Sequence, residues 1–366
     1  MQESEYWLWL SYVEDMWQAK MELLYKNFSS AKEIYNATEK DLLNIEGIKK
    51  RDVYNMNKGK KEINLSSILQ NMAKKNIKFT YFSDKDFPQK LKFIQSPPMI
   101  LFYKGKLPET DRHAVGIVGA RACTEYGRVS AYNLAKSLAI NDVDIISGMA
   151  RGIDAVSHKG CINGNGSTYA ILGCGVDVCY PAENIELYEQ ICVNGGIISE
   201  YIPNTKALAW HFPQRNRIIS AFSDSVVMIE AKEKSGSFIT VDYALEQGKS
   251  VYALPGRITD VLSTGCNKLI SEGALPLLSV EQIISGFFDD MRYKKENKKE
   301  NKKNICLAKE YKMLYSCLGL SPITVDEIML KTGLGIDKVY EGLMYLQIEG
   351  IAKEVTRGQY VVDCEN

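Results

Sequence analysis

The segment His211–Thr240, HFPQRNRIISAFSDSVVMIEAKEKSGSFIT, predicts a helix, a buried strand and the start of a second helix. Arg215 and Arg217 begin the first helix, Ser225–Glu230 forms the strand, and the turn Ser235-Gly236-Ser237 opens the second helix. Each helix start offers free backbone N–H groups and the positive end of a dipole. Arginine guanidinium groups fit phosphate oxygens. The segment therefore predicts two anion sites on neighbouring units of one sheet. Such a pair of sites is suited to successive phosphates of a nucleic-acid strand.

Similar apolar runs occur on both sides of this segment and alternate with helical patterns. Short, nearly continuous apolar strands separated by helices are typical of a parallel sheet that is covered on both faces. We therefore predict a Rossmann-like α/β core, with ligands bound at the loops that follow the strands. The other expected strands are Val115–Ala120, Val143–Gly148, Thr168–Gly173, Gly196–Tyr201 and Ser250–Gly256.

The chain is long enough for two or three domains. We expect a helical N-terminal domain at 1–72, the Rossmann-like core at 77–288, a charged linker at 289–304 and a winged-helix domain at 305–366. In the N-terminal domain, one apolar stripe at helical spacing consists of Leu8, Leu10, Val13, Trp17, Met21 and Leu24.

Two regions outside the core are candidates for DNA contact. Leu42–Met56 resembles a helix-hairpin-helix (SAM-like) turn, with Lys49 in place of the usual second glycine, and either DNA contact or helical packing is open for it. In the winged-helix domain, the third helix carries Lys338 against three acidic residues, and the domain has 9 acidic and 6 basic side chains. A recognition helix should not be net acidic, so we interpret this domain as a protein-interaction or packing module. The three acidic residues are Asp337, Glu341 and Glu349.

Composition limits the class of protein. Lysine and arginine total 45 and aspartate and glutamate total 45, so any nucleic-acid binding must come from a local basic cluster. The 9 cysteines form no C-x-x-C pair, as expected for reduced thiols in a cytosol. The start of the chain does not resemble a signal peptide, and no apolar run is long enough to span a membrane. We therefore expect a cytoplasmic protein.

The loop after the first core strand presents an arginine. The motif Gly116–Arg121, GIVGAR, lacks the G-x-G-x-x-G spacing of a dinucleotide site, so NAD binding is disfavoured. Instead, Gly119 permits a turn that places Arg121 at the mouth of the sheet, where either a ligand contact or a structural salt bridge is expected.

The next two strand ends carry further polar residues. In SGMARGID, Ser147–Asp154, we expect Arg151 at the strand end and Asp154 in the first turn of a helix rather than as a catalytic carboxylate. In GCGVDVCYP, Gly173–Pro181, Tyr180 offers either a ring for base stacking or a buried contact with Pro181.

The residues do not call for catalysis. The three histidines have no partner with the logic of a catalytic triad, the P-loop pattern is absent, and Ser235-Gly236-Ser237 lacks the P-loop lysine. His158 and Cys161 with Cys174 and Cys179 match no zinc module, so buried cysteine is the better interpretation. We expect no cofactor and no metal.

Taken in order, these motifs resemble the DNA-processing protein A family (DprA, also called Smf). That resemblance implies a protein that is not an enzyme, which binds single-stranded DNA, forms homodimers and loads the recombinase RecA during DNA uptake in natural transformation. It places Arg121, Arg151, Arg215 and Arg217 in the DNA groove, with Lys249 and Lys268 as weaker candidates. The motifs that carry the resemblance are GIVGAR, SGMARGID, GCGVDVCYP, FPQRNRIIS, SGSFIT, YALPG and GCNKLISEGA.

Three further expectations accompany the resemblance. Ser167 stands where family members often carry a basic residue, a charge that Lys159 could supply. The alternative function is a nucleotide-cleaving enzyme of the lysine-decarboxylase-like phosphoribohydrolase type, with Glu230 at the end of the strand before the Ser-Gly-Ser turn. The apolar segment Ala274–Phe288 is expected either at a dimer interface or packed on the sheet.

Overall fold

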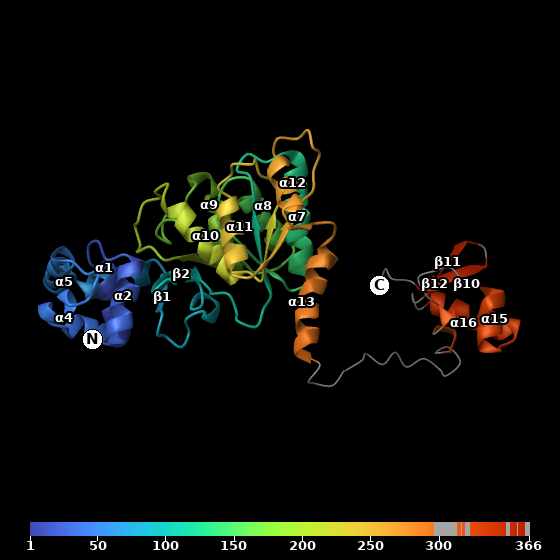
Figure 1. The fold of residues 1–366 in the computed structure, drawn as a ribbon, viewed down its shortest axis with the longest axis horizontal. Helices are drawn as coiled ribbons and strands as arrows, with labels where there is room; N and C mark the ends of the chain where they lie inside the picture. Colours follow the sequence, from blue (N-terminus) through green and yellow to red (C-terminus); the bar gives the residue numbers. More distant parts are fainter. Residues whose placement is uncertain (296–312, 316, 319–322, 349–351, 357, 363–366) are drawn as a thin grey trace. The chain divides into compact units, whose positions relative to one another are not determined.

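The chain folds into two compact units, Met1–Lys294 and Lys295–Asn366. The computed structural model describes residues 1–295, 313–315, 317–318, 323–348, 352–356 and 358–362 (Figure 1). The first unit carries a nine-stranded sheet and the second a three-stranded sheet. In the described residues, no helix is both long and apolar enough to cross a membrane.

Six helices form the N-terminal part of the first unit. Helix α1 buries Trp7, Leu8, Trp9 and Leu10 in succession, so the surrounding helices and the core enclose it on all sides. The expected apolar stripe is wrong at Trp17, whose side chain is 50% exposed. The helices are α1 (Glu3–Tyr12), α2 (Gln18–Phe28), α3 (Ala31–Asn36), α4 (Glu39–Leu43), α5 (Lys50–Glu62) and α6 (Leu65–Lys74).

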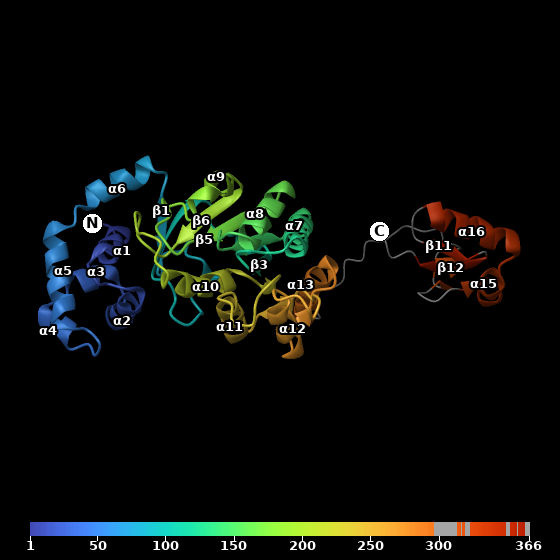
Figure 2. The same cartoon turned by 90° about the horizontal axis from the view of Figure 1, so that it is seen from above.

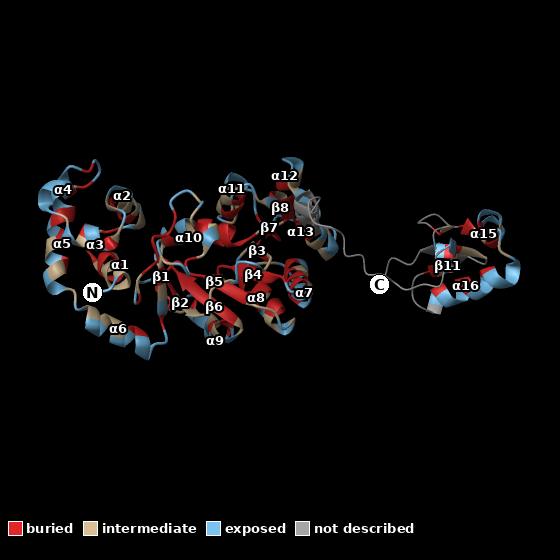
Figure 3. Ribbon diagram, turned by 90° about the horizontal axis from the view of Figure 1, so that it is seen from below, coloured by how far each residue is buried: buried red, intermediate tan, exposed pale blue. Residues whose placement is uncertain are grey.

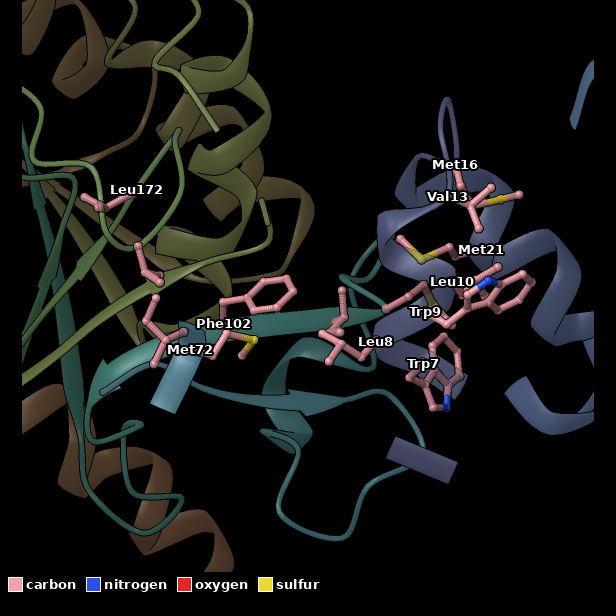
Figure 4. Packing of buried hydrophobic residues seen from close by; sticks show 14 of the residues in the cluster. Trp7, Leu8, Trp9, Leu10, Val13, Met16, Met21, Met72, Phe102 and Leu172 are labelled. Carbon is pink, nitrogen blue, oxygen red and sulfur yellow. The ribbon is translucent and has the colours of Figure 1, made fainter. Parts of the chain in front are cut away.

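The N-terminal helices share one apolar cluster with the edge of the core. Met72, at the end of α6, lies beside Phe102, and the same cluster continues to Leu172 (Figure 4). Residues 1–72 and the core therefore pack together within one compact unit.

The central sheet has the strand order β1-β2-β6-β5-β4-β3-β7-β8-β9, and its strands from β6 to β9 are parallel. All six predicted strands are present, as β3 to β8. The sequence analysis missed the two antiparallel strands at the edge, β1 and β2, and the short strand β9. The bounds are β1 (Lys78–Tyr81), β2 (Ile100–Gly105), β3 (Ala114–Val118), β4 (Asp144–Ser147), β5 (Thr168–Ile171), β6 (Gly195–Ser199), β7 (Ser225–Met228), β8 (Ser250–Ala253) and β9 (Leu275–Pro276).

Helices cover both faces of this sheet, which confirms the Rossmann-like α/β prediction. Helices α7, α8 and α9 lie on one face, and α10, α11 and α12 lie on the other (Figures 2 and 3). The chain changes face between β3 and β7, which are adjacent, so their carboxyl ends form the point where such folds bind ligands. The helix bounds are α7 (Glu125–Ile140), α8 (Ile153–Asn163), α9 (Ile185–Asn194), α10 (His211–Phe222), α11 (Phe238–Glu246), α12 (Thr264–Ser271) and α13 (Val280–Lys295), with short 3-10 turns η1 (Gln89–Leu91) and η2 (Ala182–Asn184).

The second unit has the elements of a winged helix. Its sheet has the order β10-β12-β11 and its strands are antiparallel. A separate core includes Ile328, Val339 and Leu346. The linker prediction is wrong at residues 289–295, which belong to helix α13, and residues 296–304 lie outside the described residues. The elements are β10 (Ile323–Thr324), α15 (Val325–Thr332), α16 (Ile336–Ile348), β11 (Ala352–Thr356) and β12 (Gln359–Val362).

Candidate nucleic-acid interface

A cleft of about 790 Å³ lies outside the carboxyl ends of β3, β4 and β7. Its walls are the loop 119–122 after β3, the loop 232–237 after β7 and the first turns of α10. This is the point where the chain changes from one face of the sheet to the other, so the cleft occupies the place that the fold predicts for a ligand.

The charged side chains that line the cleft are mostly basic. Arg121, Lys232 and Lys234 are exposed, and among the described residues none of them forms a salt bridge. Asp154 is the only acidic residue that lines the cleft in the described part of the chain, and it is buried. The accessible surface of the cleft therefore carries unpaired positive charge, which attracts anions.

Two of the predicted arginines meet on one aromatic ring. Phe212, in the first turn of α10, lies 5.8 Å from the Arg121 guanidinium and 5.9 Å from that of Arg215, measured to the ring centroid. Both distances allow a cation–π contact. The ring thus holds the two guanidinium groups in one cluster at the cleft.

Arg215 is buried at the base of the cleft. Its Nη1 donates to the carbonyl of Gly148, at 3.0 Å, and to that of Ile171, so it joins the ends of β4 and β5. A Cβ at Gly148 would lie 2.5 Å from the guanidinium, so any side chain at this position would displace Arg215. Burial raises the pKa of the Asp154 carboxyl, and the adjacent Arg215 opposes that rise. Arg215 therefore supports the site as much as it lines it.

Arg217 lies away from the cleft, in a buried salt bridge. Its Nη1 and Nη2 contact the two carboxylate oxygens of Glu200 at 2.7 and 2.6 Å. Its Nε donates to the carbonyl of Ser96 at 2.9 Å. Arg121 and Arg215 are brought together, but Arg217 is not part of their cluster, because its charge already has a bidentate partner.

The Ser-Gly-Ser turn forms another part of the cleft wall. Ser235, Gly236 and Ser237 all line the cleft at the start of α11. The Ser237 hydroxyl donates to the carbonyl of Gly119 at 3.0 Å, which ties this turn to the loop that carries Arg121. Both loops therefore present their backbone to the same cavity.

The remaining predicted basic residues lie outside the cleft. Arg151 is exposed and forms a bidentate salt bridge with Glu183, at 2.7 and 2.8 Å. Lys249 lies at the amino end of β8, where it lines a separate groove with Lys90 and Phe93. Lys268 lies on α12, 3.8 Å from Glu272.

The sequence and fold match a known family. The model of the DNA recombination-mediator protein A family covers residues 78–288, and that of the DprA winged-helix domain covers 300–355. Protein Smf of Synechocystis is 30% identical over 96% of this chain and 97% of its own length. The chain belongs to the DNA recombination-mediator protein A family.

Two solved structures of DNA processing protein A have the same fold. The Streptococcus pneumoniae protein has a TM-score of 0.68 and 31% identity, over 78% of this chain and 98% of that one. The Helicobacter pylori protein, with a unique single-stranded DNA binding mode, has a TM-score of 0.52 and 28% identity, over 58% of this chain and 97% of that one. The resemblance stated from the motifs and the winged-helix assignment are both confirmed.

Sequence reasoning missed two basic residues that line the cleft. Lys232 and Lys234 line it but were not among the predicted site residues. The signal was present, because a Lys-x-Lys pair directly before Ser235 falls in the loop after a core strand. Glu233 between them hid the local excess of positive charge.

Glu230, the acidic residue of the enzymatic alternative, is hydrogen-bonded to the start of helix α7. Glu230 is buried, its Oε2 accepts from the Thr124 amide at 2.8 Å, and its Oε1 accepts from the Thr124 hydroxyl. Thr124 is the N-cap of α7, so Glu230 fixes a helix start. The family is one of recombination mediators rather than known enzymes.

In the helix-hairpin-helix candidate, a carboxylate of the segment itself accepts the hydrogen bond of the hairpin amide. Lys49 caps α5, and its amide donates to the Asp52 carboxylate at 2.9 Å. That carboxylate also pairs with Lys20 at 2.5 Å. An internal carboxylate thus occupies the Lys49 amide, which favours the packing interpretation of this hairpin.

The histidine of the metal-site alternative, His158, lies in the interior. His158 is buried, its Nδ1 lies 2.6 Å from the Thr168 hydroxyl, and burial lowers its pKa to about 3. Cys161 and Cys174 are buried, as expected, but the expectation is wrong for Cys179, which is only partly buried. In the described part of the chain, no group of three or more His, Cys, Asp or Glu residues is placed to hold a metal ion.

Proposed function

We propose that this protein binds single-stranded DNA in the cleft through phosphate contacts from Arg121, Lys232 and Lys234. The observation that carries the proposal is that these exposed cations have no acidic partner among the described residues, whereas Arg151 and Arg217 do. Phosphate contacts position a strand without reading its sequence. The DNA-binding mode of the H. pylori relative supports the same role.

The test is a gel shift with single- and double-stranded oligonucleotides. Arg121→Ala should weaken single-strand binding, and each lost phosphate contact should flatten the slope of log affinity against log salt by about 0.7. Arg128→Ala is the matched control, since Arg128 is exposed on α7 and pairs with Glu125 outside the cleft. Normal binding by Arg121→Ala would place the groove elsewhere.

We infer that the protein acts in the cytoplasm as a homodimer that loads RecA. In the segment Ala274–Phe288, Ile283 and Phe287 are buried on the sheet, but Leu278 is 76% exposed beside the edge strand β9. Exposed apolar side chains at a sheet edge favour a symmetric contact between two copies. Light scattering at micromolar concentration should give the mass of a dimer for the unaltered protein and a lower average mass for Leu278→Arg. A monomer mass for the unaltered protein, with and without oligonucleotide, would contradict the dimer.

A further inference from the structure

Two tryptophans at the junction of α2 and α10 are half exposed and touch each other. Trp17 is 50% exposed and Trp210 is 46% exposed, whereas Trp7 and Trp9 are buried. The two exposed rings lie edge to face, with centroids 5.5 Å apart. A large aromatic ring that only sealed two domains would be buried for the free energy that burial provides. Their exposed faces therefore call for a ligand.

The pair is held rigidly from both sides. Gln18, next to Trp17, donates to the carbonyl of Glu200 at 3.2 Å and accepts from the Met99 amide at 2.7 Å. Trp210 packs against His211 with centroids 4.0 Å apart, and His211 stacks on Tyr201 at 4.0 Å. Because the rings are fixed before a ligand arrives, little conformational entropy is lost on binding.

The pair is also continuous with the cleft. Ala209 and Phe212, on either side of Trp210 in the chain, both line the cleft. Lys206, in the loop that leads into α10, is exposed and forms no salt bridge within the described residues. Asp15, near Trp17, is neutralised by Arg51 at 2.8 Å. Near the two tryptophans in the sequence, one acidic side chain is therefore paired and one exposed lysine is not.

We propose that Trp17 and Trp210 form a stacking platform for the bases of a single strand that leaves the cleft. The cleft cations hold the phosphates, and the indole faces take the next bases, which every sequence can supply. The proposal rests on the single-strand binding proposed above. It extends the binding path from the core onto the first helices of the chain.

The experiment compares deoxythymidine oligomers of about 4 and about 12 nucleotides, one too short to leave the cleft and one long enough to pass the platform. Trp210→Ala and Trp17→Ala should each weaken binding of the longer oligomer by at least about fivefold. Binding of the shorter oligomer should stay unchanged. Arg121→Ala should weaken binding of both.

Further variants, the salt slope and tryptophan fluorescence separate stacking from damage to the fold. Trp210→Phe keeps an aromatic face and should restore most of the affinity, and Tyr54→Ala, which removes an exposed ring on α5, should have no effect. The tryptophan variants should leave the salt slope unchanged, since stacking releases no counterion. In the unaltered protein, the longer oligomer should quench tryptophan fluorescence more than the shorter one.

Two outcomes would overturn the platform in different ways. If both alanine variants bind both oligomers normally while Arg121→Ala fails, the cleft stands and the platform is only a contact between α2 and α10. If the unaltered protein binds neither oligomer, the cleft proposal fails and the platform fails with it.

Discussion

Two groups of cations at the same edge of the sheet have different surroundings. Arg215 and Arg217, on helix α10, are buried and bonded to carbonyls or to Glu200. Arg121, Lys232 and Lys234, on the loops after β3 and β7, are exposed and have no acidic partner in the described residues. The difference shows that a basic motif indicates a binding site only where its charges are left without partners. The first group should therefore govern stability, and the second should govern affinity.

The largest expected effect is on the free energy of unfolding of Arg217→Ala. The substitution leaves Glu200 buried without its partner, which should cost about 3–5 kcal/mol. Urea denaturation of this variant beside Arg121→Ala measures the contrast. The exposed Arg121 should change stability by less than about 0.5 kcal/mol. Equal losses in the free energy of unfolding in the two variants would show that buried and exposed cations do not differ in their effect on stability.

A buried acid at the amino end of the sheet, Asp144, makes stability depend on pH. Asp144 is buried, and its Oδ1 accepts from Arg112 at 2.9 Å while its Oδ2 has no partner; burial raises its pKa to about 6. The folded state therefore keeps a proton that the unfolded chain releases, so stability should fall as the pH rises between about 4 and 6. Above about pH 6, the buried Asp144 carboxylate should lower the free energy of unfolding by up to about 3 kcal/mol.

Denaturation of Asp144→Asn across that pH range isolates the contribution. The variant should lack the part of the slope that Asp144 supplies, while Lys26→Ala, which removes an exposed salt bridge to Glu22 on α2, should keep it. Identical pH profiles for Asp144→Asn and the unaltered protein would show that Asp144 titrates alike in both states.

Removing both cleft lysines tests the affinity side of the comparison. The double variant Lys232→Ala, Lys234→Ala should bind single strands about tenfold more weakly, or by ~1.4 kcal/mol, with a salt slope smaller by about 1.4. A double variant of Lys249 and Lys268, which lie outside the cleft, is the matched control. Stronger weakening in the control would move the groove away from the cleft.

The smallest expected effect comes from deleting residues 296–366, which follow the end of α13. The segment 305–366 carries 9 acidic and 6 basic side chains, so it should add little to a polyanion's affinity. Single-strand binding should weaken by less than tenfold, or ~1.4 kcal/mol. A larger loss in a binding titration would show that the winged helix or the segment before it grips DNA.

Much of the fold could be predicted because the parallel strands are continuous apolar runs. All six runs became strands of the sheet, from β3 to β8. Strand β1 was missed because KFTY has no continuous apolar run and only Thr80 in it is buried. Its pairing with β2 is a tertiary contact, which local pattern does not report.

The site was harder to predict, because whether a cation is free depends on distant parts of the chain. Arg217 bonds to Ser96, 121 residues away, and Arg215 bonds to Gly148, 67 residues away. Nothing near either arginine in the sequence announces these partners. Arg121 could be predicted, since a residue that directly follows a core strand falls at the ligand-binding edge.

The hydrogen bonds of Glu230 to the start of α7 restrict the use of this carboxylate for catalysis. Its carboxylate lies so close to α7 that a Cβ at Gly127 would be 2.4 Å from its Cδ. A lineage that recruited this carboxylate for hydrolysis would first have to give α7 a different N-cap and move the helix away. Freeing this carboxylate would remove the hydrogen bonds that it accepts at the start of α7, so the acid and the N-cap of that helix cannot be changed independently.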